Sequence, residues 1–443
     1  MRFVQTIRNI FKIEDLRARL IYTLAIIALY RFGKYVTLPG IDPSQLGALK
    51  AQTSQGLMGL LDMFSGGAFS QASVFALGIM PYISASIVVQ LLGIVFPYFQ
   101  KLQKEGESGR RKMNQYTRYL TVAILILQAP TYLVNLTAQL PATAFVLANG
   151  FFFKLSSTII LTAGTMFVMW LGERITDKGI GNGISLIIMI GIIARLPQNF
   201  VFEAGTRMNG AGGPIGLIVE IVILFVIILG TILLVQGTRR VPVQYARRIV
   251  GNKQYGGVRQ YIPLKVNAAG VMPIIFAQAI MMLPIIIAGY AQSSSGFVVA
   301  FSNMYGFWYN LVTAILIILF TYFYTAITIN PVQMAEDMKK NGGFIPGIKP
   351  GRKTVEFFDT IMSRITLPGS IFLALIAILP AIAVKFSVTP QFAQFFGGTS
   401  LLILVGVVLD TLQQIESHLL MRHYDGLMKS GRVKGRTGGA MSI

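Results

Sequence analysis

Six isoleucines could together exclude water from a pore. They are Ile79, Ile83, Ile184, Ile188, Ile275 and Ile403. The first four form two pairs whose members are four residues apart, so the members of each pair share one face of a helix. Ordinary packing is the usual reason for isoleucines at this spacing. The alternative is a hydrophobic constriction that gates by expelling water.

Charged groups that could drive transport are scarce in the apolar segments. Glu220 and Asp410 are the exceptions, and ion-coupled carriers usually need such groups at membrane depth. The alternative is that each lies near an interface or is hydrogen-bonded to a neighbouring helix. This scarcity disfavours a solute carrier.

Catalytic and metal-binding patterns are missing from the sequence. It contains no HExxH, P-loop or GxSxG motif, its two histidines are His418 and His423, and it has no cysteine. These motifs supply the ligands, phosphate cradles and nucleophiles of common enzyme classes. We therefore predict that the chain is not an enzyme, has no catalytic residues, and holds no metal or cofactor.

The elements that carry these residues are predicted to be membrane-spanning helices. The chain is 54% hydrophobic and 12% charged, and a span needs about 20 apolar residues. The pattern predicts an all-α polytopic membrane protein with ten transmembrane helices. The predicted spans are 19–37, 74–96, 118–138, 152–171, 183–202, 214–236, 268–290, 308–328, 365–384 and 400–420.

Basic residues fix the predicted orientation of these spans. Of the 38 Lys and Arg residues, 31 fall in alternate gaps between the apolar segments, and cytoplasmic loops carry the positive excess. Both termini are then cytoplasmic, which agrees with an even number of spans. Because Glu14 and Asp15 follow the first basic residues and the first apolar run is a full span, we expect no cleaved signal peptide.

The second apolar region is broken near its start. The run from Leu57 is interrupted at Ser65-Gly66-Gly67 before a full-length span begins. Irregular backbone at membrane depth needs cover from protein or a water-filled cavity. A re-entrant lid on the external side fits this pattern; the alternative is a surface loop in the interface. The span that follows carries Ser84, Ser86 and Gln90, which should face another helix or a cavity rather than lipid.

Two basic loops are long enough to form docking structures. The first, 237–265, has seven basic residues and no acidic one, and its two extended segments predict a protruding hairpin. The second, 331–364, predicts a short amphipathic helix, a glycine hinge and a tip that presents Lys349. Such loops suit anionic lipid, an acidic protein or a ribosomal RNA backbone.

Six segments in order resemble the SecY family, the channel subunits of bacterial Sec translocons. They are FSGGAFSQASVFALGIMPYISASI, KEGESGRRK, MWLGERITDKGIGNGIS, PLKVNAAGVMPIIFA, NPVQMAEDMKKNGGFIPGIKPG and FGGTSLLI. The resemblance covers nearly the whole chain. It implies two pseudo-symmetric five-helix halves, 1–210 with a short re-entrant plug at about 60–73, and 211–443 with both basic loops and a C-terminal tail.

The resemblance also implies roles for particular residues. The six isoleucines would form the pore ring. The other implied sites are the plug, with Asp62, Phe64, Ser65, Gly66 and Gly67; the lateral gate, with Ser84, Gln90, Gln128 and Asn267; and cytoplasmic docking, with Arg110, Arg111, Arg239, Arg240, Arg247, Arg248 and Lys349. Lys349 stands where many relatives have Arg, so a point charge replaces a bidentate fork.

The function implied is a protein-conducting channel of the bacterial inner membrane. It would pass unfolded secretory polypeptides and release signal sequences and membrane helices sideways into lipid. Expected partners are SecE-like and SecG-like small membrane subunits, the SecA motor ATPase, the ribosome through its rRNA, and anionic lipid. The rival interpretations are a secondary transporter dependent on Glu220 or Asp410, an insertase without a through-pore, and a structural membrane scaffold.

Overall fold

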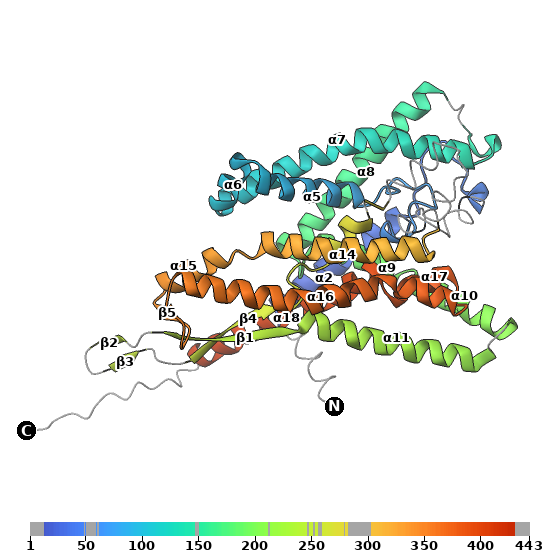
Figure 1. Ribbon diagram of the computed structural model, residues 1–443. Helices are drawn as coiled ribbons and strands as arrows, with labels where there is room; N and C mark the ends of the chain where they lie inside the picture. Colours follow the sequence, from blue (N-terminus) through green and yellow to red (C-terminus); the bar gives the residue numbers. More distant parts are fainter. Residues whose placement is uncertain are drawn as a thin grey trace, which may run out of the picture.

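The computed structural model is a helical bundle with a small sheet at one end. It describes residues 13–47, 49, 59, 62–146, 150–210, 213–245, 248–250, 253–255, 259–278, 280–281 and 303–429. Figure 1 shows the long helices running roughly side by side, with the strands at one end of the bundle. We call that end the strand end and the opposite end the far end.

The described part of the first half of the chain contains seven α-helices. They are α2 (Glu14–Gly33), α5 (Met80–Val95), α6 (Pro97–Lys104), α7 (Glu107–Gln139), α8 (Phe151–Lys178), α9 (Gly183–Ile193) and α10 (Leu196–Asn209). Between α5 and α6 the chain turns by 102°. Pro97 begins α6 and holds Phe96 in an extended conformation, because proline disfavours the helical region for the residue before it.

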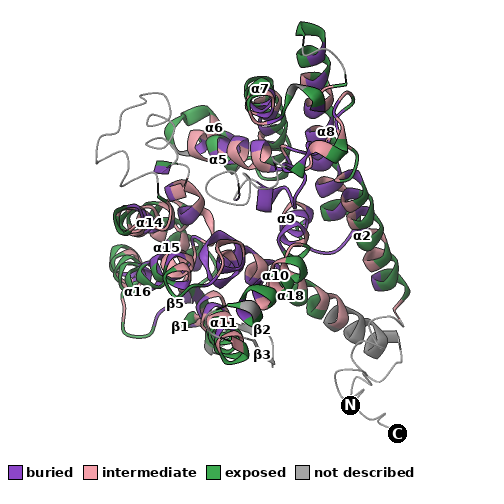
Figure 2. Ribbon diagram, turned by 90° about the vertical axis from the view of Figure 1, so that its right-hand side faces the viewer, coloured by how far each residue is buried: buried purple, intermediate pink, exposed green. Residues whose placement is uncertain are grey.

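The second half contributes the remaining described helices and the strands. The helices are α11 (Gly213–Gln236), α14 (Phe307–Thr328), α15 (Pro331–Lys340), α16 (Arg352–Lys385), α17 (Pro390–Ala393) and α18 (Gly398–Lys429). In Figure 2, α5, α7 and α8 lie on one side, α11, α14 and α16 lie on the other, and α9 lies between them.

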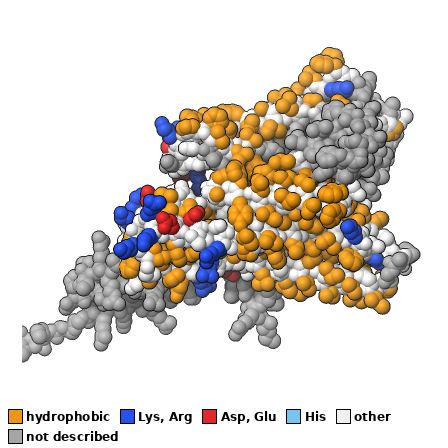
Figure 3. Space-filling view, viewed as in Figure 1, with side chains coloured by type: hydrophobic (Ala, Val, Ile, Leu, Met, Phe, Trp, Pro, Cys, Tyr) orange, Lys and Arg blue, Asp and Glu red, His pale blue; other side chains and the backbone are white. Residues whose placement is uncertain are grey.

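Among the described residues, seven helical segments are long and apolar enough to cross a membrane, or eight if the bent α5–α6 pair is one span. The other two predicted spans are α2, which carries Glu14, Asp15 and three arginines near its ends, and 268–290. Of that last segment, residues 272–278 are helical, and most of the rest lies outside the described residues. On the face shown in Figure 3, hydrophobic side chains cover most of the described part of the bundle.

Two helices begin well before the membrane spans that were predicted within them. The third and ninth spans were predicted to start at 118 and 365, whereas α7 begins at Glu107 and α16 at Arg352. Both helices start in the charged sequence that precedes the apolar stretch. Arg, Lys and Glu favour the helical conformation, so a helix can extend beyond the apolar stretch into water. The predicted fifth span is two helices, α9 and α10, with Pro197 in the first turn of α10.

The predicted hairpin in the first basic loop is confirmed. Strand β1 (Thr238–Tyr245) pairs antiparallel with β4 (Arg259–Lys265), from Thr238 opposite Lys265 to Gln244 opposite Arg259. Two short strands, β2 (Arg248–Val250) and β3 (Lys253–Tyr255), pair beyond them. The predicted amphipathic helix is α15, and β5 (Gly343–Phe344) after it adds to the free edge of β1.

The hairpin is fixed to the bundle by an apolar cluster at the strand end. Val241 and Val243 alternate with exposed residues along β1 and are buried. They pack with Met338 of α15 and Phe358 of α16. Burial of these side chains joins the loops 237–265 and 331–364, which the segment 266–330 separates in the sequence, into one platform.

Candidate functional site

A cavity of about 1040 Å³ lies among helices of both halves. Its lining includes five of the six predicted ring residues: Ile83, Ile184, Ile188, Ile275 and Ile403. They come from α5, α9, the helical stretch at 272–278 and α18. Residues that are far apart in the sequence therefore meet around one space.

Ile79 occupies a different position from the other five isoleucines. It precedes α5, is only 1% exposed, and belongs to a buried cluster that also contains Phe64, Ile188 and Ile403. Ile83 and Ile184 pack against the same cluster. Ile79 thus lies behind the cavity wall, in contact with the group that forms it.

The broken segment after Met63 closes over this cluster. Phe64 and Phe69 both line the cavity, and residues 65–70 form turns rather than a helix. Each of the residues Asp62, Phe64 and Ser65 is at most 6% exposed. The interface-loop alternative for these residues is therefore wrong. Leu60, at the predicted start of the plug, lies outside the described residues.

Two glycines allow the segment to fold tightly against the helices around it. Gly66 and Gly67 have φ values of +65° and +89°. Residues that carry a Cβ rarely adopt such backbone angles. A Cβ on Gly66 would lie 2.9 Å from the Gly191 backbone of α9. The predicted glycine break is therefore required by both backbone conformation and close approach.

Charged and polar groups hold the segment in place. Arg195, between α9 and α10, forms an ion pair with Asp62, whose Oδ1 also accepts a 2.8 Å hydrogen bond from the Ser70 backbone N–H. Arg31 of α2 donates to the Gly66 carbonyl at 3.1 Å. The Tyr132 hydroxyl of α7 donates to the Phe69 carbonyl at 3.0 Å. The Asp62 side chain is 2% exposed, so Arg195 supplies the countercharge for a buried carboxylate.

The predicted lateral-gate residues divide into two groups. Ser84, Gln128 and Asn267 line the cavity. Gln90 does not; its Oε1 accepts a 3.0 Å hydrogen bond from the Tyr324 hydroxyl of α14. This bond joins α5 of the first half to α14 of the second half, so it connects the two halves at their common edge.

A second charged cluster lies at the far end, and the sequence reasoning found only one of its members. Arg207 of α10 donates to Glu203 at 3.2 Å and forms an ion pair with Glu220 of α11. Glu203 Oε2 also accepts a 2.9 Å hydrogen bond from the Thr389 backbone N–H. All three charged side chains are at most 9% exposed.

This cluster confirms the non-transport alternative for Glu220, which is hydrogen-bonded to a neighbouring helix. The Glu203–Arg207 spacing of four residues was a local signal for an ion pair. Asp410, the other carboxylate considered for a transport role, is exposed and lines the cavity.

The predicted docking residues gather at the strand end. Arg110, Arg111, Arg239, Arg240 and Lys349 are exposed, and Figure 3 shows Lys and Arg side chains collected at this end of the molecule. Arg248 lies in β2, and Arg247 lies outside the described residues.

The arrangement can form an apolar seal with a removable cover, and it offers no reactive group. Among the described residues, no cluster of three His, Asp or Glu side chains could hold a metal ion. Branched aliphatic side chains around a narrow space expel water and so stop ions. The cover above them is held by the packing of Phe64 and by a few polar contacts that water could replace.

Comparison with known proteins identifies related chains. The sequence profile of the SecY family matches residues 73–412. The Corynebacterium glutamicum protein translocase subunit SecY is 44% identical over 438 residues, which covers 95% of this chain and 98% of that protein.

Solved structures share the fold. One is a SecY structure whose description states that the plug domain stabilises the closed state of the translocation channel. Its TM-score to this chain is 0.61 at 17% identity, and the match covers 95% of each chain. Another is Sec61 in a canine ribosome-channel complex from the endoplasmic reticulum, with a TM-score of 0.56, 17% identity and 95% coverage of each chain. Such channels have ten helices in two halves with a plug.

Proposed function

This chain belongs to the SecY family of protein translocase subunits, and from that premise we propose that it is a protein-conducting channel whose idle pore is sealed by the isoleucine cluster and the segment from Asp62 to Ser73. The family is a non-enzymatic one, in agreement with the predicted absence of catalysis. The observation that supports the proposal best is the inter-helix cavity lined by five isoleucines and covered by Phe64 and Phe69.

The seal works by exclusion of water. A ring of branched aliphatic side chains gives an ion no ligand to replace its hydration shell. The same side chains can yield around a passing polypeptide because they bind no particular side chain. A charged ring would hold some segments too tightly to release them.

Opening requires an energy source outside the chain. The plug leaves when a bound signal helix favours the open arrangement over the closed one by differential binding energy. Separation of α5 from α14, with loss of the Gln90–Tyr324 hydrogen bond, would give that helix and membrane-protein helices a sideways exit into lipid. The work of directed movement would come from a motor or from protein synthesis.

The location we propose is the bacterial inner membrane, with both termini in the cytoplasm. The chain is a multi-pass membrane protein whose relatives are bacterial. The concentration of Lys and Arg in alternate gaps supports placing the strand end in the cytoplasm. The far end, with the plug, would then face the periplasm.

The basic surface at the strand end is the proposed docking platform. Arg239 and Arg240 on β1 and Lys349 after β5 lie on structures held together by buried packing. Arg110 and Arg111 lie separately, at the start of α7. The proposed partners are the SecA motor and the ribosome, through its RNA backbone. The ribosome-bound relative supports the second of these. SecE-like and SecG-like subunits and anionic lipid remain proposals from family membership and charge.

The isoleucine seal is tested by removing side chains from it. Replacing Ile83 or Ile188 by glycine opens space in the constriction, and we expect the ion leak of the idle channel to rise about tenfold or more, because the dewetted region shortens. The measurement is ion conductance in planar bilayers. Ile223→Gly on the exposed face of α11 is the matched control for glycine in a helix. Unchanged conductance in both ring variants would argue for ordinary packing.

The docking platform is tested at Lys349. Lys349→Glu reverses one exposed charge, and we expect motor-driven secretion to fall several-fold more than ribosome-linked membrane insertion, since a single charge at the tip contributes little to a large RNA interface. Reconstituted assays of both pathways with the same protein preparation provide the comparison. Equal losses in the two pathways would refute a motor-specific role for this tip.

A further inference from the structure

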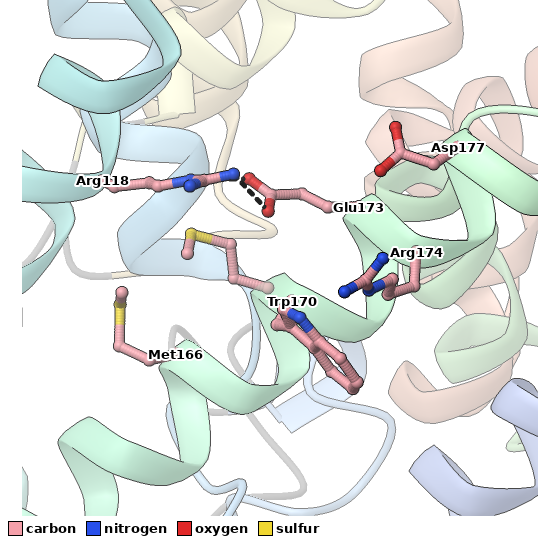
Figure 4. A pocket seen from close by; sticks show the side chains of 7 residues that line it. Arg118, Met166, Trp170, Glu173, Arg174 and Asp177 are labelled. Carbon is pink, nitrogen blue, oxygen red and sulfur yellow. Dashed lines mark hydrogen bonds and ion pairs between the residues drawn. The ribbon is translucent and has the colours of Figure 1, made fainter. Parts of the chain in front are cut away.

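A second cavity, of about 500 Å³, lies between α7 and α8 on the flank of the first half. It is lined by Arg118 of α7 and by six residues of α8: Met166, Met169, Trp170, Glu173, Arg174 and Asp177. Figure 4 shows these side chains around a common space. None of them belongs to the isoleucine-lined cavity described above.

The lining changes character along α8. Met166, Met169 and Trp170 come first, and the charged residues follow in the last two turns before the helix ends at Lys178. At 1.5 Å per residue, Arg174 lies about 6 Å from the helix end. In a membrane-spanning helix, side chains this close to the helix end lie at the level of the lipid headgroups, where tryptophan is also enriched. Trp170 is 45% exposed, so this face is open to the membrane.

Two of the four charged side chains neutralise one another. Arg118 donates two hydrogen bonds to Glu173, of 3.0 and 2.6 Å, in the bidentate geometry typical of strong pairs. The other two charged side chains are those of Arg174 and Asp177. The Arg174 guanidinium lies 5.1 Å from the centre of the Trp170 ring. Within the part of the chain that the structure describes, Arg174 and Asp177 form no ion pair.

The cavity therefore presents one cation and one anion above an apolar floor. We propose that it binds the headgroup of a zwitterionic phospholipid, with the phosphate on Arg174 and the primary ammonium on Asp177. The acyl chains would descend past Trp170 and Met166 towards the middle of the membrane. The ligand class is thus a phosphoethanolamine lipid in the leaflet next to the strand end.

The charge balance decides against an anionic lipid. A phosphatidylglycerol headgroup would satisfy Arg174 through its phosphate, but its glycerol is uncharged, so the lipid would bring no ammonium to pair with Asp177. A primary ammonium also has three hydrogen-bond donors for the carboxylate. The Arg118–Glu173 pair would act as a fixed wall rather than as a ligand.

Trp170 itself reports on the site, because the chain has only two tryptophans, and the other, Trp308, lies in the first turn of α14. The Trp308→Phe variant leaves Trp170 as the probe, and Trp170→Phe leaves Trp308 as the control. Each full-length variant is placed in nanodiscs of equal phosphatidylethanolamine and phosphatidylglycerol, with brominated chains on one lipid at a time. Bromine quenches the fluorescence of a neighbouring tryptophan.

We expect Trp170 to be quenched about threefold more efficiently when the bromines are on phosphatidylethanolamine, and Trp308 to show a ratio near one. Asp177→Asn in the Trp170 background should bring its ratio to about one. Asp177 is exposed, so the substitution should leave the fold intact, which the unchanged emission maximum of Trp170 checks. A ratio near one for Trp170, a preference for brominated phosphatidylglycerol, or an Asp177→Asn variant that keeps the preference would overturn the proposal.

Discussion

Replacing Arg195 by glutamine is expected to raise the ion leak of the idle channel by about tenfold or more. The substitution leaves the Asp62 carboxylate buried without its cation, whereas in the displaced plug that carboxylate is hydrated. Loss of one partner of a buried pair costs about 3–5 kcal/mol. We discount this to about 2 kcal/mol because Arg195 is 23% exposed, which corresponds to roughly a thirtyfold change in the closed–open equilibrium.

The matched variants separate charge from packing. Asp62→Asn keeps the shape and leaves only the partly exposed Arg195 unpaired, so its leak should be smaller than that of Arg195→Gln. The double variant should leak less than Arg195→Gln alone, because it contains no buried unpaired charge. Leak is measured as dye and ion efflux from proteoliposomes. An Arg195→Gln channel as tight as the parent would show that Phe64 packing alone holds the plug.

Replacing Arg207 by leucine is expected to destabilise the folded protein by about 3–5 kcal/mol. Glu203 and Glu220 both depend on this guanidinium, and their side chains are 0% and 8% exposed. The three residues join α10 of the first half to α11 of the second half. Thermal unfolding of the purified protein measures the loss.

A compensated variant distinguishes charge from lost volume. Replacing both glutamates by glutamine in the Arg207→Leu background removes the uncompensated charge, and most of the stability should return. Arg352→Leu is the surface control, since its side chain is 94% exposed; it should change stability by less than about 0.5 kcal/mol. A small effect of Arg207→Leu, similar to that control, would mean that water reaches the two carboxylates in the folded state.

Helices, strands and turns whose formation depends on neighbouring residues were predicted from local patterns in the sequence. The apolar runs located the long spans, and the two extended segments of the 237–265 loop predicted the hairpin. The glycine pair at Gly66 and Gly67 indicated the break that the structure places against α9. Helix ends were less accurate, because Glu107 and Arg352 begin helices in charged sequence that hydropathy assigns to loops.

Contacts between distant segments could not be read from such patterns. Arg195 pairs with Asp62 across 133 residues, and Tyr324 bonds to Gln90 across 234. Neither partner has a local signature, because the pairing depends on how the helices pack. The gathering of the isoleucines was proposed by resemblance, and the structure separates Ile79 from the five that line the cavity.

In the proposed mechanism, a polypeptide passes through the isoleucine-lined cavity. The chain contains no cysteine, so single cysteines can be placed at Ile83, Ile188 and Ile275, with Phe225 on the exposed face of α11 as the control. A secretory precursor that carries one cysteine is stalled during transfer and oxidised. We predict adducts at the three cavity positions and none at position 225. A precursor that is demonstrably engaged but forms no adduct at any cavity position would contradict passage through this site.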